Sequence, residues 1–310
     1  MAIRTGTSGA DTLVGEEGGD LLSGFGGGDR LDGAGGNDAV FGGDGNDTLF
    51  GGAGDDAVAG GAGDDSVVGD ASGGGPNPVE RGGDPGRNLL LGGGGNDTVR
   101  GGYGEDTAFG GDGNDSIVGW GFGPPSPSGS EAWEALDDAD ALWGGDGNDA
   151  IRGGGGDDRV GGGSGSDTLQ GGYGTDTLSG GSGADRFLFG REGIAGELLD
   201  GGVGRDNRDV VADFRPGEDL LDLSGYRSSF LPQGTPPPVF VGAGPFGADP
   251  VEDGYRLQVR YEVEGNRTIV QIYSPFNAAP PEFGVPPPTA TVEIELLGAR
   301  GISAGGVFLG

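Results

Sequence analysis

Single apolar positions recur every nine residues along the first two thirds of the chain. The clearest unit is 42–50 (GGDGNDTLF), in which Leu49 follows seven glycine or polar residues. We number its positions 1 to 9 from Gly42. Positions 7 and 9 should face outward and the apolar position 8 inward, which is the two-residue period of a short strand. A fixed period of this length predicts stacked coils in place of an ordinary globular core.

The nine-residue units form three blocks, at 1–68, 83–118 and 135–189. They start at residues 6, 15, 24, 33, 42, 51 and 60, at 83, 92, 101 and 110, and at 135, 144, 153, 162, 171 and 180. A Pro/Gly-rich insertion, 69–82, and a Pro/Ser-rich insertion, 119–134, separate the blocks. We expect both insertions to lie between whole repeats and to loop out from a turn without breaking the stack.

Each unit predicts a six-residue turn and a three-residue strand. Glycine at positions 1, 2 and 4 permits positive φ angles and a close approach between turns. Position 8 is expected to face inward, and positions 7 and 9 outward. Two units then make a coil of about 18 residues, and the fold class is an all-β parallel β-roll. Its narrow core holds Leu13, Leu31, Val40, Leu49, Val58, Val67, Val99, Ile117, Ile151, Val160, Leu169 and Leu178.

The pattern changes in the C-terminal region, 190–310, where β-branched and aromatic runs replace glycine. We expect strands over 187–189, 209–214, 239–241, 289–297 and 307–309. Two alternating runs, 255–263 and 268–273, predict a β-hairpin. The region should form a β-rich cap on the open end of the roll, since a stacked repeat needs a polar terminal cover.

Aspartate stands at position 6 of nearly every unit. Stacking places alternate turns on one edge about 4.8 Å apart, so carboxylates and turn carbonyls converge. Ca²⁺ binds six to eight oxygens of this kind. The sequence therefore predicts about 10–15 calcium ions. The predicted carboxylate ligands are Asp11, Asp20, Asp29, Asp38, Asp47, Asp56, Asp65, Asp97, Asp106, Asp115, Asp140, Asp149, Asp158, Asp167, Asp176 and Asp185, and Asn88 takes the place of the acid in one unit.

The turn glycines of the clearest units complete the predicted calcium sites. Without side chains, they leave their carbonyl oxygens bare and allow adjacent turns to approach. The glycines assigned to metal sites are Gly42, Gly43, Gly45, Gly51, Gly52, Gly54, Gly60, Gly61, Gly63, Gly101, Gly102, Gly104, Gly162, Gly163, Gly165, Gly171, Gly172 and Gly174.

Composition supports a role for cations in folding. Glycine (79) and proline (19) make up about a third of the 310 residues, and 50 acidic against 17 basic residues give a net charge of −33. Repulsion on this scale opposes a compact state unless cations neutralise it, and about 14 calcium ions would come close to doing so. An excess of acid also argues against nucleic acid and anionic membranes as partners.

The residue types exclude several kinds of chemistry. The chain contains neither Cys nor His, so it has no disulfide, no Cys/His zinc site and no Ser-His-Asp or Cys-His catalytic group. No run reaches the ~18 apolar residues of a transmembrane helix. The N-terminus lacks a Sec-type apolar stretch, and no catalytic module precedes residue 6. We therefore expect a protein that is not an enzyme and inserts into no membrane.

Some acids and aromatics outside position 6 allow two interpretations. Asp55, Asp64, Glu105 and Asp157, at position 5, either tune calcium affinity or are only solvated.

Glu131, Glu134, Asp137 and Asp138 beside Trp133 either form a glycosidase-like pair or belong to a Pro-rich loop. That loop would carry a short helix, 131–136, capped by Ser128 or Ser130. Tyr103 and Tyr173 either stack on sugars or only decorate turns.

The nonapeptide resembles that of the RTX (repeats-in-toxin) proteins. The segments 180–189 (GGSGADRFLF) and 209–224 (DVVADFRPGEDLLDLS) resemble the C-terminal module of serralysin-type proteases and mannuronan epimerases. This resemblance implies further calcium ligands at Asp213, Asp219 and Asp222. It also implies export by a type I apparatus that reads an uncleaved C-terminal signal, here the segment 302–310.

These patterns and the resemblance predict a secreted, extracellular calcium-binding protein that folds as it binds calcium outside the cell. Extracellular modules bind Ca²⁺ at about 10⁻⁴–10⁻³ M, well above cytosolic levels. Two roles are compatible with this. One is a structural or adhesive protein at an extracellular polysaccharide or cell surface. The alternative is a non-catalytic module that partners a secreted protease or polysaccharide-modifying enzyme.

Overall fold

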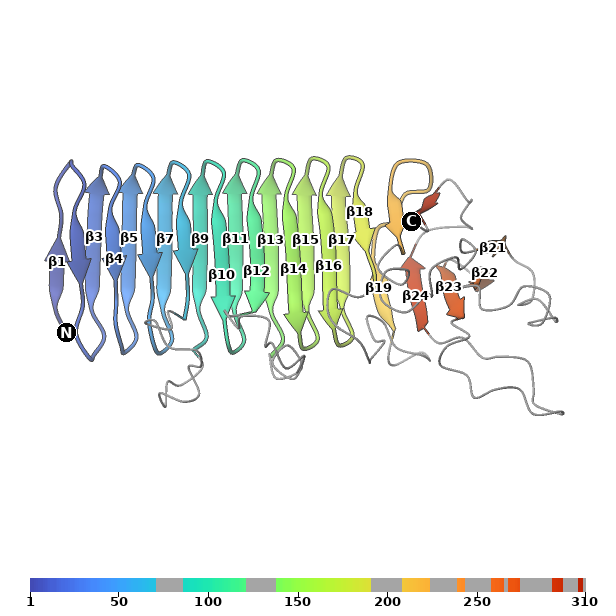
Figure 1. The fold of residues 1–310 in the computed structure, drawn as a ribbon, viewed down its shortest axis with the longest axis horizontal. Coiled ribbons are helices and arrows are strands. Elements are labelled where there is room, and N and C mark those ends of the chain that lie inside the picture. The colour runs from blue at the N-terminus through green and yellow to red at the C-terminus, as the bar shows by residue number, and fades with distance from the viewer. Residues whose placement is uncertain are drawn as a thin grey trace, which may run out of the picture.

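A computed structural model shows an elongated parallel β-roll with further strands at its C-terminal end (Figure 1). The structure describes residues 1–70, 86–120, 138–190, 208–223, 239–242, 258–264, 267–273, 292–297 and 306–308. The all-β parallel roll predicted from the nine-residue period is confirmed. The expected helix at 131–136 lies outside the described residues.

Two sheets face each other along the roll, and the chain alternates between them at every unit. The 14-stranded sheet, here sheet A, has the order β1-β3-β5-β7-β9-β11-β13-β15-β17-β19-β24-β23-β22-β21. The 11-stranded sheet, sheet B, has the order β2-β4-β6-β8-β10-β12-β14-β16-β18-β20-β25. Among the repeats every strand pairs in parallel with the strand one coil later, as a β-roll requires.

The strands of sheet A are β1 (Ile3–Thr5), β3 (Leu21–Gly26), β5 (Ala39–Asp44), β7 (Ala57–Ala62), β9 (Leu89–Gly94), β11 (Thr107–Asp112), β13 (Ala141–Asp146), β15 (Arg159–Ser164), β17 (Thr177–Ser182), β19 (Asp209–Val211), β21 (Val239–Gly242), β22 (Gln258–Glu264), β23 (Arg267–Tyr273) and β24 (Val292–Leu297). Those of sheet B are β2 (Thr12–Val14), β4 (Arg30–Asp32), β6 (Thr48–Phe50), β8 (Ser66–Val68), β10 (Thr98–Gly102), β12 (Ser116–Trp120), β14 (Ala150–Gly155), β16 (Thr168–Tyr173), β18 (Arg186–Leu188), β20 (Leu220–Asp222) and β25 (Val307–Phe308).

Many strands are longer than the expected three residues. In sheet A, β5 runs from position 7 of one unit to position 3 of the next, because Gly43 and Asp44 also pair with Gly61 and Ala62 of the following coil. Positive φ angles occur at positions 2 and 4, for example 119° at Gly43 and 129° at Gly45. Position 1 is not among these, so its glycine serves a different purpose.

The core is one row of position 8 side chains along each sheet. Leu22, Val40, Leu90 and Leu178 in sheet A and Leu31, Leu49, Val99 and Leu169 in sheet B are fully buried. Leu13, at the open N-terminal end, is only partly buried. The inward orientation predicted for position 8 is therefore confirmed.

Position 9 faces outward, also as predicted. On sheet A it forms an exposed apolar row of Phe41, Leu91, Phe109 and Trp143. The rings of Phe109 and Trp143 stack at 4.9 Å between centroids.

The roll continues across both insertions. Strand β7 pairs with β9 and β8 with β10 across the first, and β11 pairs with β13 and β12 with β14 across the second. The insertions do not lie between whole repeats, however. Gly69 and Asp70 donate backbone hydrogen bonds to Arg100 and Gly101 as positions 1 and 2 of a turn, and that unit resumes at Gly86. The expectation was wrong because a turn, exposed at the edge, accepts extra residues without disturbing the strands.

The C-terminal strands extend both sheets. Strand β19 adds in parallel to β17 and then pairs with β24, while β20 adds to β18. The predicted hairpin is present as β22 and β23, which pair antiparallel. No helix in the described part of the chain is long and apolar enough to cross a membrane.

Candidate metal centre

The position 6 aspartates stand in two ladders, one along each edge of the roll. Ladder A precedes the strands of sheet A and contains Asp20, Asp38, Asp56, Asn88, Asp106, Asp140, Asp158, Asp176 and Asp209. Ladder B precedes those of sheet B and contains Asp11, Asp29, Asp47, Asp65, Asp97, Asp115, Asp149, Asp167, Asp185 and Asp219. The structure thus places the predicted acids in two rows, one along each edge of the roll.

One carboxylate oxygen of each aspartate holds the ladder together. Oδ1 of Asp47 accepts the backbone N–H of Asp29 at 2.7 Å, and the N–H of Asp47 donates to Oδ1 of Asp65 at 2.8 Å. The same bond repeats at every step of both ladders. It satisfies a backbone donor that points along the stack, so it fixes the orientation of the carboxylate.

The second oxygen, Oδ2, has no hydrogen-bond partner in thirteen of the described ladder residues, although it is buried. These residues are Asp29, Asp38, Asp47, Asp56, Asp65, Asp97, Asp106, Asp115, Asp140, Asp149, Asp167, Asp176 and Asp209. A buried, unpaired carboxylate oxygen is costly unless a cation compensates it.

The turn glycines leave space for such a cation. A Cβ on Gly42 would overlap Asp47 Oδ2 and the carbonyl oxygen of Gly60. A Cβ on Gly43 or Gly45 would overlap the position 2 or position 4 carbonyl oxygen of the preceding turn. By contrast, a Cβ on Gly94 at position 3 would meet nothing within 4 Å. In these turns, glycine therefore stands where oxygens gather.

Burial raises the pKa of several ladder carboxyls, and neighbouring acids add to the effect. The pKa is raised to about 7 at Asp56, Asp65 and Asp140, and to about 9 at Asp106. The backbone N–H that each Oδ1 accepts acts in the opposite direction but does not outweigh burial. At neutral pH these sites favour a positive ligand over an unpaired anion.

The donor set fits calcium. Each step offers carboxylate and carbonyl oxygens, with neither nitrogen nor sulfur, and Ca²⁺ binds such oxygens in irregular geometries. In the described ranges no three acidic side chains gather at one point. The carbonyl oxygens of the turns would therefore have to supply the rest of the coordination shell.

Comparison with known families agrees with this geometry. A family model described as RTX calcium-binding nonapeptide repeat (4 copies) matches residues 5–40, 41–72, 82–121, 134–169 and 161–192, which is more than half of the chain. The chain belongs to this RTX family. It is a calcium-binding β-roll protein. A search of curated proteins gives no match.

Two ladder residues of the RTX chain lie beyond the repeats. Asp209 accepts the N–H of Asp176, and Asp219 accepts that of Asp185. Asp219 was expected from the resemblance, but Asp209 was missed. The signal was in the sequence, because Asp209-Val210-Val211 repeats the order acid, x, apolar of positions 6 to 8.

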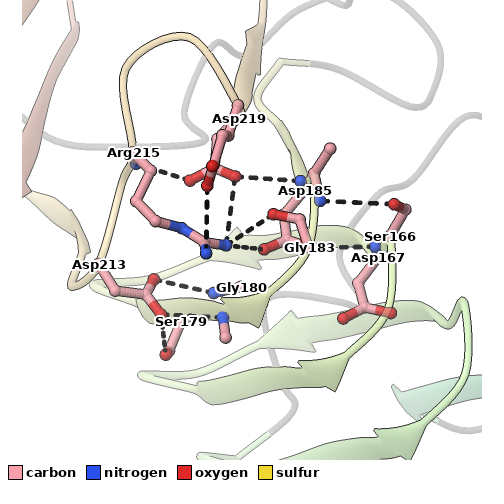
Figure 2. Close-up of polar contacts among 12 residues, drawn as sticks. Ser166, Asp167, Ser179, Gly180, Gly183, Asp185, Asp213, Arg215 and Asp219 are labelled. Carbon is pink, nitrogen blue, oxygen red and sulfur yellow. Dashed lines mark hydrogen bonds and ion pairs between the residues drawn. The ribbon is translucent and has the colours of Figure 1, made fainter.

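The other two acids suggested by the resemblance lie off the ladders. Asp213 accepts hydrogen bonds from Ser179 Oγ at 2.7 Å and from the backbone of Gly180 and Gly181 (Figure 2). Asp222, fully buried, pairs with Arg186. Both tie the C-terminal strands to the last repeats.

The position 5 residues form an exposed ladder of their own. Oδ1 of Asp55 accepts the N–H of Arg87 at 2.9 Å, and Oδ1 of Asp64 accepts that of Asn96 at 2.7 Å. Asp157 does the same for Thr175, whereas Glu105 pairs with Arg87. These side chains therefore stabilise turns and are more than solvated charge.

Asn88 is the one departure from aspartate within the described ladders. Its Oδ1 accepts the N–H of Asp56 at 3.0 Å, so the ladder bond survives. Its amide nitrogen lies 3.4 Å from Oδ1 of Asp70, a carboxylate that also accepts the N–H of Tyr103. Burial raises the pKa of Asp70 to about 6. Asp70 was not predicted, because the insertion hides its position in the repeat.

The remaining candidates are only partly described. Tyr103 and Tyr173 are half-buried on the turns. Glu131, Trp133, Glu134 and Asp137 lie outside the described residues.

Proposed function

We propose that the position 6 aspartates and the turn carbonyls hold a row of calcium ions along each edge of the roll, and that these ions drive folding. The thirteen buried, unpaired Oδ2 atoms support this best. For most of them, a Cβ on the position 1 glycine would overlap both the Oδ2 atom and a turn carbonyl oxygen. Their number also falls within the 10–15 ions expected from the repeat.

Calcium would compensate the negative charge of the carboxylates, and the chain would hold these carboxylates in position. Oδ1 holds each carboxylate through the ladder bond, so Oδ2 faces the neighbouring turn in the folded chain. Without ions, the net charge of −33 and the buried carboxylates oppose the folded state. Binding to the folded form alone stabilises it, and many linked sites make the transition steep.

We further propose that the chain leaves the cell unfolded and folds outside it. Calcium concentrations rise across that boundary into the range that extracellular modules bind. Export would use a type I apparatus, as the resemblance of the C-terminal segment suggests. The folded roll would then serve as a rigid structural or adhesive element.

The test is far-UV circular dichroism of the EDTA-treated full chain, titrated with Ca²⁺ and separately with Mg²⁺. We expect a cooperative change from coil to β-structure with Ca²⁺ near 10⁻⁴–10⁻³ M. Mg²⁺ should fail at the same concentrations, because it demands near-octahedral geometry. A metal-free chain that is already β-rich would refute calcium-driven folding.

A further inference from the structure

The two acid ladders end differently at the C-terminal end of the roll. Ladder A ends at Asp209, whose Oδ2 is buried and unpaired like that of Asp176 before it. Ladder B ends at Asp219, and here neither Asp185 nor Asp219 has an unpaired buried oxygen. The difference lies in one residue, Arg215, through its side chain and its backbone N–H.

Arg215 reaches into the last step of ladder B (Figure 2). Its Nη2 lies 3.3 Å from Oδ2 of Asp185 and 3.6 Å from Oδ1 of Asp219. The same nitrogen donates to the carbonyl oxygen of Gly183 at 2.7 Å. The backbone N–H of Arg215 donates to the second oxygen of Asp219 at 2.6 Å.

These partners are the kinds of oxygen that border every earlier step. Asp185 Oδ2 corresponds to the unpaired Oδ2 of Asp167 one coil before. Gly183 stands at position 4, whose carbonyl oxygen in preceding turns lies against the next turn's glycine, as that of Gly147 does against Gly165. A guanidinium nitrogen therefore occupies the space between two ladder acids and a position 4 carbonyl.

We infer that Arg215 is a built-in cation that takes the place of calcium at the last step of ladder B. A guanidinium keeps its charge at all working pH values and can contact several oxygens at once. The last repeat and β20 are then joined without an ion, whereas the end of ladder A still requires one. This inference rests on the proposed calcium rows. It adds that the row along ladder B ends in the Arg215 guanidinium and not in a calcium ion.

The experiment compares calcium stoichiometry by native mass spectrometry for the full-length wild type, Arg215→Ala and Arg215→Gln. Both substitutions remove the charge and leave Asp185 Oδ2 and the Gly183 carbonyl free. We expect each variant to bind one more Ca²⁺ than the wild type at saturation. Arg159→Ala removes the same charge from the exposed face of β15 and should leave the number unchanged.

Hydrogen exchange at a calcium concentration just above the folding midpoint provides a second readout, which does not count bound ions. Backbone amides of 180–190 and 208–223 should exchange faster in Arg215→Gln than in the wild type. If both variants bind the wild-type number of ions and exchange is unchanged, Arg215 does not replace calcium. If the wild type itself binds no calcium, the proposed function fails instead, so the two failures are distinguishable.

Discussion

At the residue scale, each ladder aspartate uses its two oxygens for different purposes. In Asp115, for example, Oδ1 accepts a backbone N–H from the neighbouring coil, and Oδ2 stays free in the buried space beside Gly110. Asparagine can perform the first task, as Asn88 does, but its neutral amide cannot perform the second. Structure and metal binding therefore separate within one side chain.

Replacing Asp115 by asparagine tests this separation. Oδ1 of Asp115 accepts the N–H of Asp97 at 2.8 Å, and an amide oxygen can keep that bond. We expect Asp115→Asn to fold at saturating calcium but to bind at least one ion fewer, with a higher calcium midpoint. Native mass spectrometry and circular dichroism measure the two quantities.

The matched control for that substitution is Asp64→Asn. Asp64 is exposed at position 5, where Asn46 and Asn96 stand in neighbouring coils. Its ion count should equal that of the wild type. A loss of ions in both variants would assign the effect to net charge and not to the ladder.

At the element scale, most strands of the repeats bury one apolar side chain, that of position 8. Leu169 of β16 is fully buried and lies in register with Ile151 of β14 and Phe187 of β18. The core is thus a single file in each sheet, with no second layer to compensate for a lost side chain. Backbone ladders and bound ions must supply the remaining stability.

Truncating one core position should therefore weaken the roll strongly. We expect Leu169→Ala to lower the free energy of unfolding by about 2–5 kcal/mol, the usual cost of such a cavity. The adjacent Thr168 is only half-buried and faces outward, so Thr168→Ala should cost about 1 kcal/mol or less. Urea unfolding at saturating calcium measures both, and equal losses would contradict the single-file core.

At the scale of the whole molecule, protons and calcium would compete for the same carboxylates in the proposed sites. Burial raises the pKa of many ladder acids in the metal-free roll, to about 6 at Asp97, Asp149 and Asp167 and higher at Asp106. In the unfolded chain these carboxyls have the ordinary aspartate pKa of 3.8. The folded chain thus holds their protons more tightly than the unfolded chain does.

The sign of the pH effect follows from these raised values. Without metal, the stability contributed by these acids is fully present below pH 3.8 and is lost as pH rises through about 6–9. We expect the EDTA-treated chain to gain β-structure on acidification from pH 8 to 4. The calcium midpoint should rise over the same change, because protons displace calcium. A midpoint that stays constant from pH 8 to 5 would contradict this competition.

The sequence by itself determined the period, the inward residue of each unit and the edge on which each repeat acid stands. These follow from local geometry, because a nine-residue unit with its glycines at fixed positions can only stack in one register. The sequence also indicated calcium, since its repeated donors are all oxygen atoms.

Only the tertiary structure decided how distant segments complete the ladders. Asp209 and Asp219 join their ladders after gaps of 33 and 34 residues, and no period connects them to Asp176 and Asp185. Arg215 reaches ladder B for the same reason, and at the first insertion Asp70 reaches Asn88 of ladder A. A local pattern fixes neighbours within a coil, whereas the closure of a long loop depends on the packing of the strands on either side of it.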